Sequence, residues 1–458
     1  MKIKLTDVAH AVHATNDITE YADIEITSVA FDSRDLKPGA LFIPLIADND
    51  GHNFIADAQA NGAVATLWGK DHIASVPNDF PVLLVNDTLI GLQDLARAYL
   101  AKLNPKVVAV TGSNGKTTTK DLIAAIGSTQ YNMIKTPENF NNEIGTPITI
   151  LRMEQSTELL VVELGMDRSG QLDFLSNLVK PDIAVITMIG EAHIEFFKTR
   201  ARIADAKMEI VNGLNPEGLF VYNGDEPLLV ERAQNVKQEQ RTFGLDASNE
   251  LYAIDIQADD YSTSFQTNKW PNITFTIPLL GDYNVANALA AISIGIELGI
   301  SAENLQIALR NVVLTSNRTQ WIQMRNGARI LSDVYNSNPT AAKEVLKTFA
   351  NTRVDGKRYV VLGDMLELGE DSRDLHAQLA DYIEPAEVAG VYLVGEDVTA
   401  LAAALQAKFT TDQIHQYAAN DKASLVTDLQ AILEPTDTVM LKASHGIHLE
   451  QVLAELLK

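Results

Sequence analysis

The 458-residue sequence predicts an α/β protein with three domains. Its length corresponds to about three domains of roughly 150 residues each. From residue 106 onward, short uninterrupted apolar runs alternate with helical patterns, as in parallel sheets that are buried on both faces. We therefore expect a small α/β domain over residues 1–104, a central domain with a parallel sheet over 105–315, and a Rossmann-like, doubly wound domain over 316–458.

The first hundred residues show strand patterns at 24–29, 40–44 and 82–85 and a helical segment near 55–62. A helix that includes residues 92–103 is expected to end at Asn104-Pro105, which is a plausible linker.

The central domain begins with expected strands at 107–110, 159–164 and 183–188 and a helix over 116–126. Apolar residues then alternate with polar ones between about 251 and 280, which predicts a small antiparallel ribbon, and a helix over 284–298 follows. The C-terminal domain combines strands at 330–331, 359–362, 391–394 and 439–441 with helical patterns at 340–350, 372–383, 396–407 and 446–457. Consecutive strand–helix units predict a doubly wound sheet whose functional edge lies at the carboxyl ends of the strands.

The segment from Val107 to Lys120 carries the most specific chemical pattern. A buried strand, a glycine turn and a helix N-terminus would direct several backbone N–H groups and the positive helix end toward one anion. Lys116 would add a charge for the β- and γ-phosphates, and the Thr117 hydroxyl would ligate Mg²⁺. The general motif has a glycine where this chain has Val110, so an ordinary glycine turn is the alternative. We predict a nucleoside triphosphate site made of Gly112, Ser113, Asn114, Gly115, Lys116, Thr117 and Thr118.

The composition narrows the classes of function. With 36 basic and 60 acidic residues, the formal net charge is −24, which disfavours binding to nucleic acid or to an anionic membrane. The chain has no cysteine, so disulfides, thiolate catalysis and cysteine-type zinc sites are excluded. We expect no signal peptide, because charged and polar residues interrupt Met1–Asp7, and no membrane span, because no uncharged apolar run of about 18 residues occurs. We expect a cytoplasmic monomer.

Polar residues after the phosphate loop are further candidates. Thr136–Pro147 is rich in Asn, Gly and Pro, so it is expected to be a loop. It is either an ordinary connection or a binding segment for substrate or the phosphate loop through Asn139, Asn141 and Asn142. Glu163 ends a strand, where an acidic residue typically reaches Mg²⁺ in phosphate-loop enzymes; the alternative is a solvated carboxylate.

Two basic residues follow in the same domain. His193 comes after the strand at 183–188, at the sheet edge expected for the phosphate loop, and is either a ligand or a structural histidine. Lys207 lies on a helix whose apolar stripe includes Ile203 and Ile210, and from spacing alone it is a solvated lysine.

Three loops of the C-terminal domain each follow a strand: Asp333–Pro339, Val361–Glu370 and Lys442–His445. Together they are expected to form a wall for a ligand held between domains. Pro339 is well placed to begin the next helix.

Taken together, these residues resemble the Mur ligase family over essentially the whole chain. The family's phosphate loop has the pattern T-G-x-x-G-K-T-T, as at residues 111–118. Within the family, four segments favour the joining of D-alanyl-D-alanine to UDP-N-acetylmuramoyl-tripeptide: Thr136–Gly145, Asp333–Pro339, Leu362–Glu370, and Asp32-Ser-Arg34 with Asp50-Gly-His52. The Asp-Tyr-Ala-His type of sequence found in sister ligases is absent.

The resemblance implies an amide synthesis that consumes ATP with Mg²⁺. The tripeptide carboxylate would attack the γ-phosphate to give an acyl phosphate and ADP, and the dipeptide amine would then displace phosphate. Catalysis would consist largely of positioning and of neutralising charge on the transferring oxygens.

The resemblance also implies roles for individual residues. Lys116, His193 and Lys207 would be catalytic; Thr117 and Glu163 would hold a first Mg²⁺ and His193 a second; Lys207 matches a lysine that is carbamylated in several members. Asn284 and Asn287 would contact adenine, and Arg318 and Asp333 the ribose and phosphates. The UDP end would face Ser28, Asp32, Ser33 and Arg34, and the dipeptide would lie near Asn336 and Asn338.

The sequence departs from the family at two places. His445 replaces an arginine in the usual Lys-Gly-Ser-Arg, which removes a permanent charge, and Tyr283 replaces a common histidine. The alternatives are another amide ligase of the superfamily (a Mur ligase that adds an earlier residue, or a folylpolyglutamate synthase-like enzyme), a nucleotide-dependent switch, and an inactive relative. No Asn-Lys-x-Asp guanine motif supports the switch.

Overall fold

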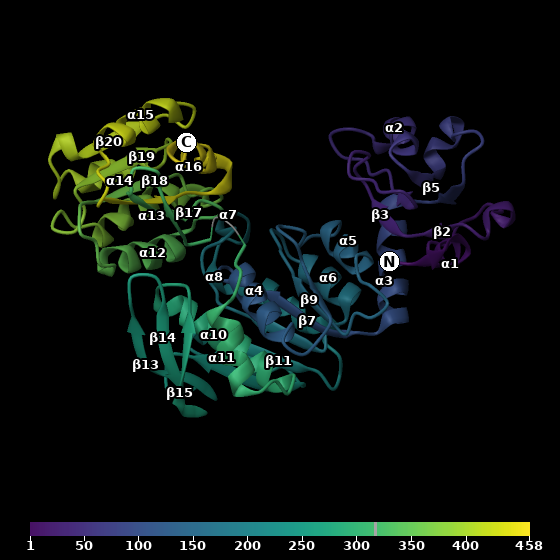
Figure 1. Ribbon diagram of the computed structural model, residues 1–458, viewed down its shortest axis with the longest axis horizontal. Coiled ribbons are helices and arrows are strands. Elements are labelled where there is room, and N and C mark those ends of the chain that lie inside the picture. Colours follow the sequence, from purple (N-terminus) through teal and green to yellow (C-terminus); the bar gives the residue numbers. More distant parts are fainter. Residues whose placement is uncertain (316–317) are drawn as a thin grey trace. The chain divides into compact units, whose positions relative to one another are not determined.

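The computed structural model describes residues 1–315 and 318–458 (Figure 1). The chain divides into two compact units, each assembled from separated segments. The first comprises residues 1–110, 130–184 and 209–219, and the second comprises 111–129, 185–208 and 220–458. The division passes through strands β10 (Ile183–Ile186) and β11 (Leu219–Asn223) and just before the last residue of β7 (Lys106–Thr111).

A four-stranded parallel sheet forms the core of the N-terminal part of the first unit. Its order is β3 (Ser28–Ala30), β4 (Ala40–Phe42), β5 (Ala63–Gly69) and β6 (Val82–Val85). Helix α2 (Ile55–Ala60) and a short pair of strands, β1 (Ile3–Lys4) and β2 (Glu25–Ile26), accompany it, with α1 at Leu5–Ala11. The expected strand at 82–85 is confirmed, whereas β5 was not predicted.

Helix α3 (Thr88–Leu103) follows this sheet and ends where the sequence predicts. The Asp87 side chain caps its N-terminus by accepting hydrogen bonds from the Leu89 and Ile90 N–H groups. Asn104 closes the helix with φ +50°, a left-handed conformation that asparagine tolerates, and Pro105 prevents continuation.

The remainder of the first unit contains three parallel strands in the order β8 (Met133–Lys135), β9 (Leu159–Glu163) and β7. Buried residues fill all five positions of β9, as expected for a strand covered on both faces. Helices α5 (Gly145–Leu151) and α6 (Gln171–Val179) belong to this part. The predicted loop over 136–147 is shorter than expected, because α5 begins at Gly145 and contains Pro147 in its first turn.

The second unit begins with α4 (Lys116–Gly127), and further along the chain it contains the predicted ribbon. Strands β13 (Leu251–Ala258), β14 (Thr263–Thr267) and β15 (Trp270–Ile277) pair antiparallel, while β12 (Glu239–Gly244) pairs parallel with β13. Helix α10 (Asp282–Glu297), expected at 284–298, follows the ribbon. The other helices of this part are α7 (Ile194–Phe197), α8 (Arg200–Met208), α9 (Pro227–Ala233) and α11 (Ala302–Arg310).

The C-terminal sheet of the second unit has the order β16 (Gln320–Gln323), β17 (Arg329–Asp333), β21 (Thr438–Lys442), β18 (Arg358–Gly363), β19 (Gly390–Val394) and β20 (Ile414–Tyr417). Only the edge strand β16 runs antiparallel among these six. Two apolar clusters, one around Leu362 and one around Val361, use alternate residues of the same strand and so pack on its opposite faces. This is the predicted doubly wound sheet.

Four of the helices in this region were expected and one was not. They are α12 (Pro339–Asn351), α13 (Ser372–Ala377), α14 (Thr399–Leu405), α16 (Leu449–Leu456) and the unpredicted α15 (Lys422–Ile432). Helices α14 and α16 begin three residues later than the sequence pattern suggests. The expected domain boundary at 315/316 adjoins Ser316 and Asn317, which lie outside the described residues.

Candidate active site

The phosphate loop forms the predicted turn between β7 and α4. Gly115 has φ +79° immediately before Lys116, the first residue of the helix. A side-chain carbon at Gly115 would collide with the Asn287 amide, so both the backbone angle and the available space require glycine here. The loop therefore packs tightly against α10.

The residues that follow β10 support this loop from a second side. The Thr187 N–H donates to the Thr111 carbonyl at 3.0 Å, and the Ser113 N–H donates to the Met188 carbonyl at 2.9 Å. The Thr187 hydroxyl also donates to the Asn114 carbonyl at 2.5 Å. These bonds fix the loop backbone and engage the Ser113 N–H, so the phosphate oxygens would be held by other N–H groups of the loop.

Two lysines predicted to be catalytic belong to the same unit. The Lys116 ammonium donates to the Gly112 carbonyl at 2.8 Å, so its charge lies at the loop. Lys207, on α8, is only 2% exposed. Burial, and secondarily the positive charge of Lys116, lowers the pKa of Lys207 well below its usual range. The interpretation of Lys207 as a solvated surface lysine, made from spacing alone, is therefore wrong.

His193 is held by an acidic residue far along the chain. Its Nδ1 and the Glu367 carboxylate are 2.5 Å apart, and this hydrogen bond lowers the pKa of Glu367. The Glu195 N–H also donates to the Glu367 carbonyl at 3.0 Å. Because Nδ1 is occupied by Glu367, a metal at His193 would use Nε2.

A cavity of about 340 Å³ in the second unit brings many of the predicted nucleotide residues together. Those in its wall are Asn114, Gly115 and Thr118 of the loop, Asn284 and Asn287 of α10, and Arg318, Asp333 and Asn336 of the C-terminal part. Lys116, Thr117, His193, Lys207 and Asn338 belong to the same unit but lie outside this wall.

The two asparagines of α10 are oriented by hydrogen bonds. The Asn284 amide donates to the Leu280 carbonyl at 2.8 Å, and Asn287 donates to the Asn284 Oδ1 at 3.2 Å. The Thr119 hydroxyl donates to the Asn287 Oδ1 at 3.2 Å, which links α10 to α4. Both asparagines are buried, as their proposed contact with a base requires.

Lys442 orders the cavity wall at the end of β21, and it was not among the predicted site residues. Its ammonium is 2.5 Å from the Asp333 carboxylate and donates to the Asn336 carbonyl at 2.9 Å. The sequence did contain a signal for this role, because Lys442 ends an apolar strand pattern. A lysine is rarely buried without a partner, so a buried lysine at that position indicates an ion pair.

His445, which stands where the family motif has arginine, stacks on Tyr335 with 5.4 Å between the ring centroids. The Arg318 guanidinium carbon lies 4.0 Å from the centroid of the same Tyr335 ring. Position 445 therefore contacts an aromatic ring that already interacts with an arginine.

The candidates of the first unit near β9 are held by local bonds. Glu163 is 2% exposed, pairs with Val110 of β7, and accepts a hydrogen bond from the Asn141 amide at 2.9 Å. Asn142 accepts from the Gly145 N–H at 2.9 Å at the start of α5, and Asn139 is exposed. Asn141 thus orients the predicted metal ligand, while Asn142 is engaged in a turn.

The candidates at the N-terminal sheet include a local ion pair. Arg34 binds the Asp32 carboxylate at 2.6 Å, and the hydrogen bonds from its side chain and backbone lower the pKa of Asp32 to about 2. The Ser33 carbonyl accepts from the Asn61 amide at 2.8 Å. The Ser28 hydroxyl is buried in β3 and has no hydrogen-bond partner among the described residues.

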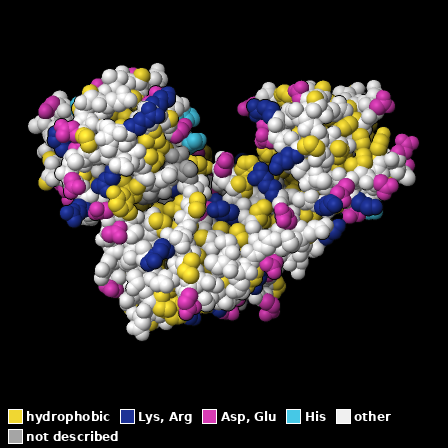
Figure 2. Space-filling view, viewed as in Figure 1, with side chains coloured by type: hydrophobic (Ala, Val, Ile, Leu, Met, Phe, Trp, Pro, Cys, Tyr) yellow, Lys and Arg dark blue, Asp and Glu magenta, His cyan; other side chains and the backbone are white. Residues whose placement is uncertain are grey.

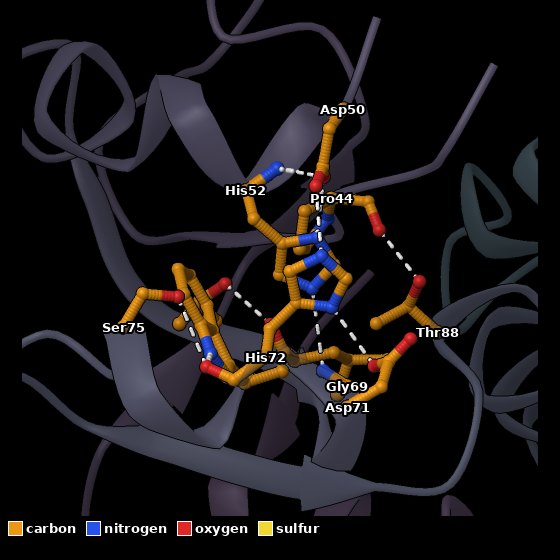
Figure 3. Close-up of polar contacts among 11 residues, drawn as sticks. Pro44, Asp50, His52, Gly69, Asp71, His72, Ser75 and Thr88 are labelled. Atoms are coloured by element: carbon orange, nitrogen blue, oxygen red, sulfur yellow. Dashed lines mark hydrogen bonds and ion pairs between the residues drawn. The ribbon is translucent and has the colours of Figure 1, made fainter.

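A further group in the first unit has metal-ligand chemistry. Asp50, His52 and His72 place one ligand atom each within 4.8 Å of one another (Figure 3). However, the two imidazole rings are stacked, with centroids 3.9 Å apart and planes inclined by 3°. Since a metal binds in the plane of each imidazole, one ion cannot serve both rings in this arrangement.

The hydrogen bonds assign protons to this group instead. His52 accepts from the Gly69 N–H on Nε2 at 3.3 Å, so its Nδ1 carries the proton that faces Asp50 at 2.7 Å. His72 faces Asp71 and Asp50 with its two nitrogens, both at 2.8 Å, and these carboxylates raise the pKa of His72. The group is therefore a cluster of carboxylates and imidazoles that joins the segment at residues 50–52 to the segment at residues 69–72.

Comparison with known proteins places this geometry in a family. Residues 110–295 match the Mur ligase middle domain, and residues 317–445 match the Mur ligase glutamate ligase domain. The UDP-N-acetylmuramoyl-tripeptide–D-alanyl-D-alanine ligase of Bacillus subtilis is 39% identical over 460 aligned residues, covering 100% of this chain and 99% of that protein.

Two solved structures extend the likeness to the whole fold. A crystal structure of MurF from Acinetobacter baumannii has a TM-score of 0.86 at 26% identity, with 100% and 99% of the two chains covered. MurF ligase from Thermotoga maritima, solved in complex with ADP, has a TM-score of 0.81 at 28% identity and coverage of 94% and 96%.

The chain belongs to the Mur ligase family, and it is an ATP-dependent ligase that forms ADP. The predicted fold class, an α/β architecture of three domains, is confirmed. Among the described residues, no helix is long and apolar enough to cross a membrane.

Acidic side chains are spread over the face shown in Figure 2 and are interspersed with Lys and Arg.

Proposed function

We propose that this enzyme joins D-alanyl-D-alanine to UDP-N-acetylmuramoyl-tripeptide, converting ATP to ADP and phosphate. Relatives that match along nearly their full length carry this activity in their names. The observation that carries the proposal is the phosphate loop, which lies beside a cavity walled by Asn284, Asn287, Arg318 and Asp333. A triphosphate on the loop and a nucleoside in the cavity fit this arrangement.

The reaction balances in two steps. The terminal carboxylate of the tripeptide attacks the γ-phosphorus, the bond to ADP breaks, and an acyl phosphate forms. The amine of the dipeptide then attacks the acyl carbon, loses a proton and displaces inorganic phosphate. Lys116 stabilises charge on the transferring oxygens, and the loop N–H groups orient them.

The side chains proposed as metal ligands have chemistry that suits Mg²⁺, because a hydroxyl and a carboxylate offer the oxygen atoms that this ion prefers. Thr117 is 4% exposed and is the second residue of α4, while Glu163 stays a predicted ligand on β9. His193, oriented by Glu367, is the proposed ligand of a second ion. When bound, Mg²⁺ neutralises charge on the phosphate oxygens.

Lys207 is proposed to act as a carbamate. A neutral amine is the form that reacts with CO₂, and burial, which lowers the pKa of Lys207, favours that form. The product is an anion that could bind a cation. Native mass spectrometry in bicarbonate buffer should show the gain of one CO₂ on Lys207, and Lys207→Arg should lack it. An unchanged peptide mass in the active enzyme would refute this role.

We assign the N-terminal domain, 1–104, to the UDP end through Ser28, Asp32, Ser33 and Arg34, and the domain over 105–315 to ATP. The domain over 316–458 would hold the dipeptide near Asn336 and Asn338, with Asn139, Asn141 and Asn142 near the tripeptide. We further propose a monomer in the cytoplasm, where these substrates would be available.

The test is phosphate release by the purified protein with Mg·ATP, the UDP-tripeptide and D-alanyl-D-alanine, each omitted in turn. Release that requires all three, with a product heavier than the UDP-tripeptide by the dipeptide minus water, supports the proposal. Release with a single amino acid in place of D-alanyl-D-alanine would indicate a Mur ligase that adds an earlier residue. Release with a folate substrate would indicate a folylpolyglutamate synthase-like enzyme. Lys116→Ala serves as the matched inactive control.

A further inference from the structure

Asn114 of the phosphate loop and Asn338 of the C-terminal part form a reciprocal pair of side-chain amides. The Asn338 Nδ2 donates to the Asn114 Oδ1 at 2.8 Å, and the Asn114 Nδ2 donates to the Asn338 Oδ1 at 3.1 Å. The two residues are 224 positions apart in the sequence. Each amide thus satisfies a donor and an acceptor of the other.

The orientation of both amides follows from the backbone. Asn338 is the N-cap of α12, and its Oδ1 accepts from the Ala341 N–H at 3.0 Å. This bond identifies Oδ1, which accepts from the helix and from the Asn114 Nδ2, so the other atom of the Asn338 amide is the Nδ2 that donates to Asn114. The Asn114 amide then has a single complementary orientation. Asn338 is 2% exposed, so loss of Asn114 would remove the acceptor of a buried Nδ2 group.

A second segment of the site holds the same end of α12. The Glu191 carboxylate accepts from the Thr340 N–H at 3.1 Å and from the Thr340 hydroxyl at 2.7 Å. Its negative charge is favourable at a helix N-terminus. Glu191 lies two residues before His193, in the segment that follows the β10–Thr187 support of the phosphate loop. Two parts of the ATP site therefore bind the first turn of one helix.

Helix capping alone does not explain the choice of residues. Serine, threonine or aspartate would cap α12 equally well, but a hydroxyl or a carboxylate does not present the separate N–H donor and oxygen acceptor, side by side, that match a second amide. The side chain of Asn114 points to Asn338, while phosphate binding by the loop requires only its backbone N–H. The pairing of two asparagines thus serves the contact between loop and helix.

We propose that the Asn114–Asn338 pair is a positioning contact that couples the state of the phosphate loop to the placement of α12 and of the adjoining Asn336 loop, where the dipeptide amine is expected. The inference rests on the proposed function. The acyl carbon is generated at the phosphate loop and the amine must reach it from the C-terminal part, so a misplacement of about 1 Å costs roughly a hundredfold in rate. The positioning role belongs to the paired side-chain amides and is separate from the predicted binding of phosphate by the Asn114 backbone and from the predicted place of the dipeptide near Asn338.

The first test is a double-mutant cycle with Asn114→Ala and Asn338→Ser. Serine keeps the N-cap of α12 but is too short to reach Asn114, so the fold is retained. We expect each single variant to lower kcat by about ten- to a hundredfold with KM for ATP little changed, and the double variant to be no slower than the worse single variant. Effects that multiply in the double variant would overturn the coupling.

A control cycle combines Asn114→Ala with Ser301→Ala, which removes the N-cap of α11, where the Ser301 hydroxyl accepts from the Asn304 N–H. Its effects should multiply. A general loss of stability would produce the same pattern in both cycles, whereas the positioning role predicts non-additivity for the Asn338 cycle alone.

A second test needs no ligation. Hydrogen exchange of residues 338–342 is measured with and without Mg·ADP. We expect Mg·ADP to slow exchange in the wild type and to have little effect in Asn114→Ala. Equal protection in both proteins would overturn the coupling. A wild type that shows this protection but releases no phosphate with the three substrates would refute the proposed function and leave the coupling supported.

Discussion

Replacing Lys442 with methionine should destabilise the C-terminal sheet more than most single substitutions. Lys442 is 1% exposed, and its ammonium neutralises the Asp333 carboxylate at 2.5 Å. Methionine fills a similar volume but leaves this carboxylate buried without its cation, which costs about 3–5 kcal/mol. The Asn336 carbonyl also loses its donor, which adds about 1 kcal/mol.

The assay is denaturant unfolding followed by the fluorescence of Trp321, which pairs with Leu331 across β16 and β17. The chain has three tryptophans, so Trp68→Phe and Trp270→Phe isolate this signal. In the double variant Lys442→Met, Asp333→Leu both charges are gone, and much of the stability should return. A single-variant cost below about 1 kcal/mol, or a double-variant cost equal to the sum of the singles, would refute the assignment of a buried ion pair.

Lys116→Ala should abolish phosphate release but leave binding of the UDP-tripeptide unchanged in calorimetry; loss of both would show that the domains are wrongly assigned. Gly115→Ala would place alanine at a left-handed backbone angle, which costs about 1–2 kcal/mol of strain, and its Cβ would collide with Asn287. The affinity for Mg·ADP should therefore fall sharply. The control is Gly170→Ala, because Gly170 also has a positive φ but an added Cβ there would have no neighbour within 4 Å. This variant should lose only the stability that corresponds to the backbone strain. The raised pKa of His72 means that its two carboxylates stabilise the fold fully below its unfolded pKa, near 6.5, and that this contribution disappears as pH rises through the folded pKa. Melting curves of wild type and His72→Gln should therefore differ most at acidic pH and converge at alkaline pH, and a constant difference would contradict the cluster.

The sequence predicted those elements whose position depends on residues that are neighbours in the chain. The glycine turn before Lys116 and the strand at 82–85 were found because residue type and spacing dictate them. The end of α3 at Asn104 was found for the same reason. Helix α15 escaped prediction although it has an ordinary capped start at Asp421, since its apolar stripe is narrow.

The partners of the site residues could not be predicted, because they are distant in sequence. Nothing near His193 indicates that Glu367 will orient it, and nothing near Asp333 indicates Lys442. Asn338 was predicted as a dipeptide residue from its motif alone, whereas its observed partner is Asn114. The dipeptide role stays a prediction.

The separation of these partners also sets when the site can be completed during synthesis. Asn114 is added to the growing chain 224 residues before Asn338. At roughly 5–20 residues per second, that interval lasts about ten to forty-five seconds. Throughout it the phosphate loop lacks its contact with α12, and its neighbour Asn287 is also missing for most of the time. A nascent chain therefore acquires a fully supported nucleotide site only when the C-terminal part has emerged, so ATP can stabilise the finished protein far more than its folding precursors.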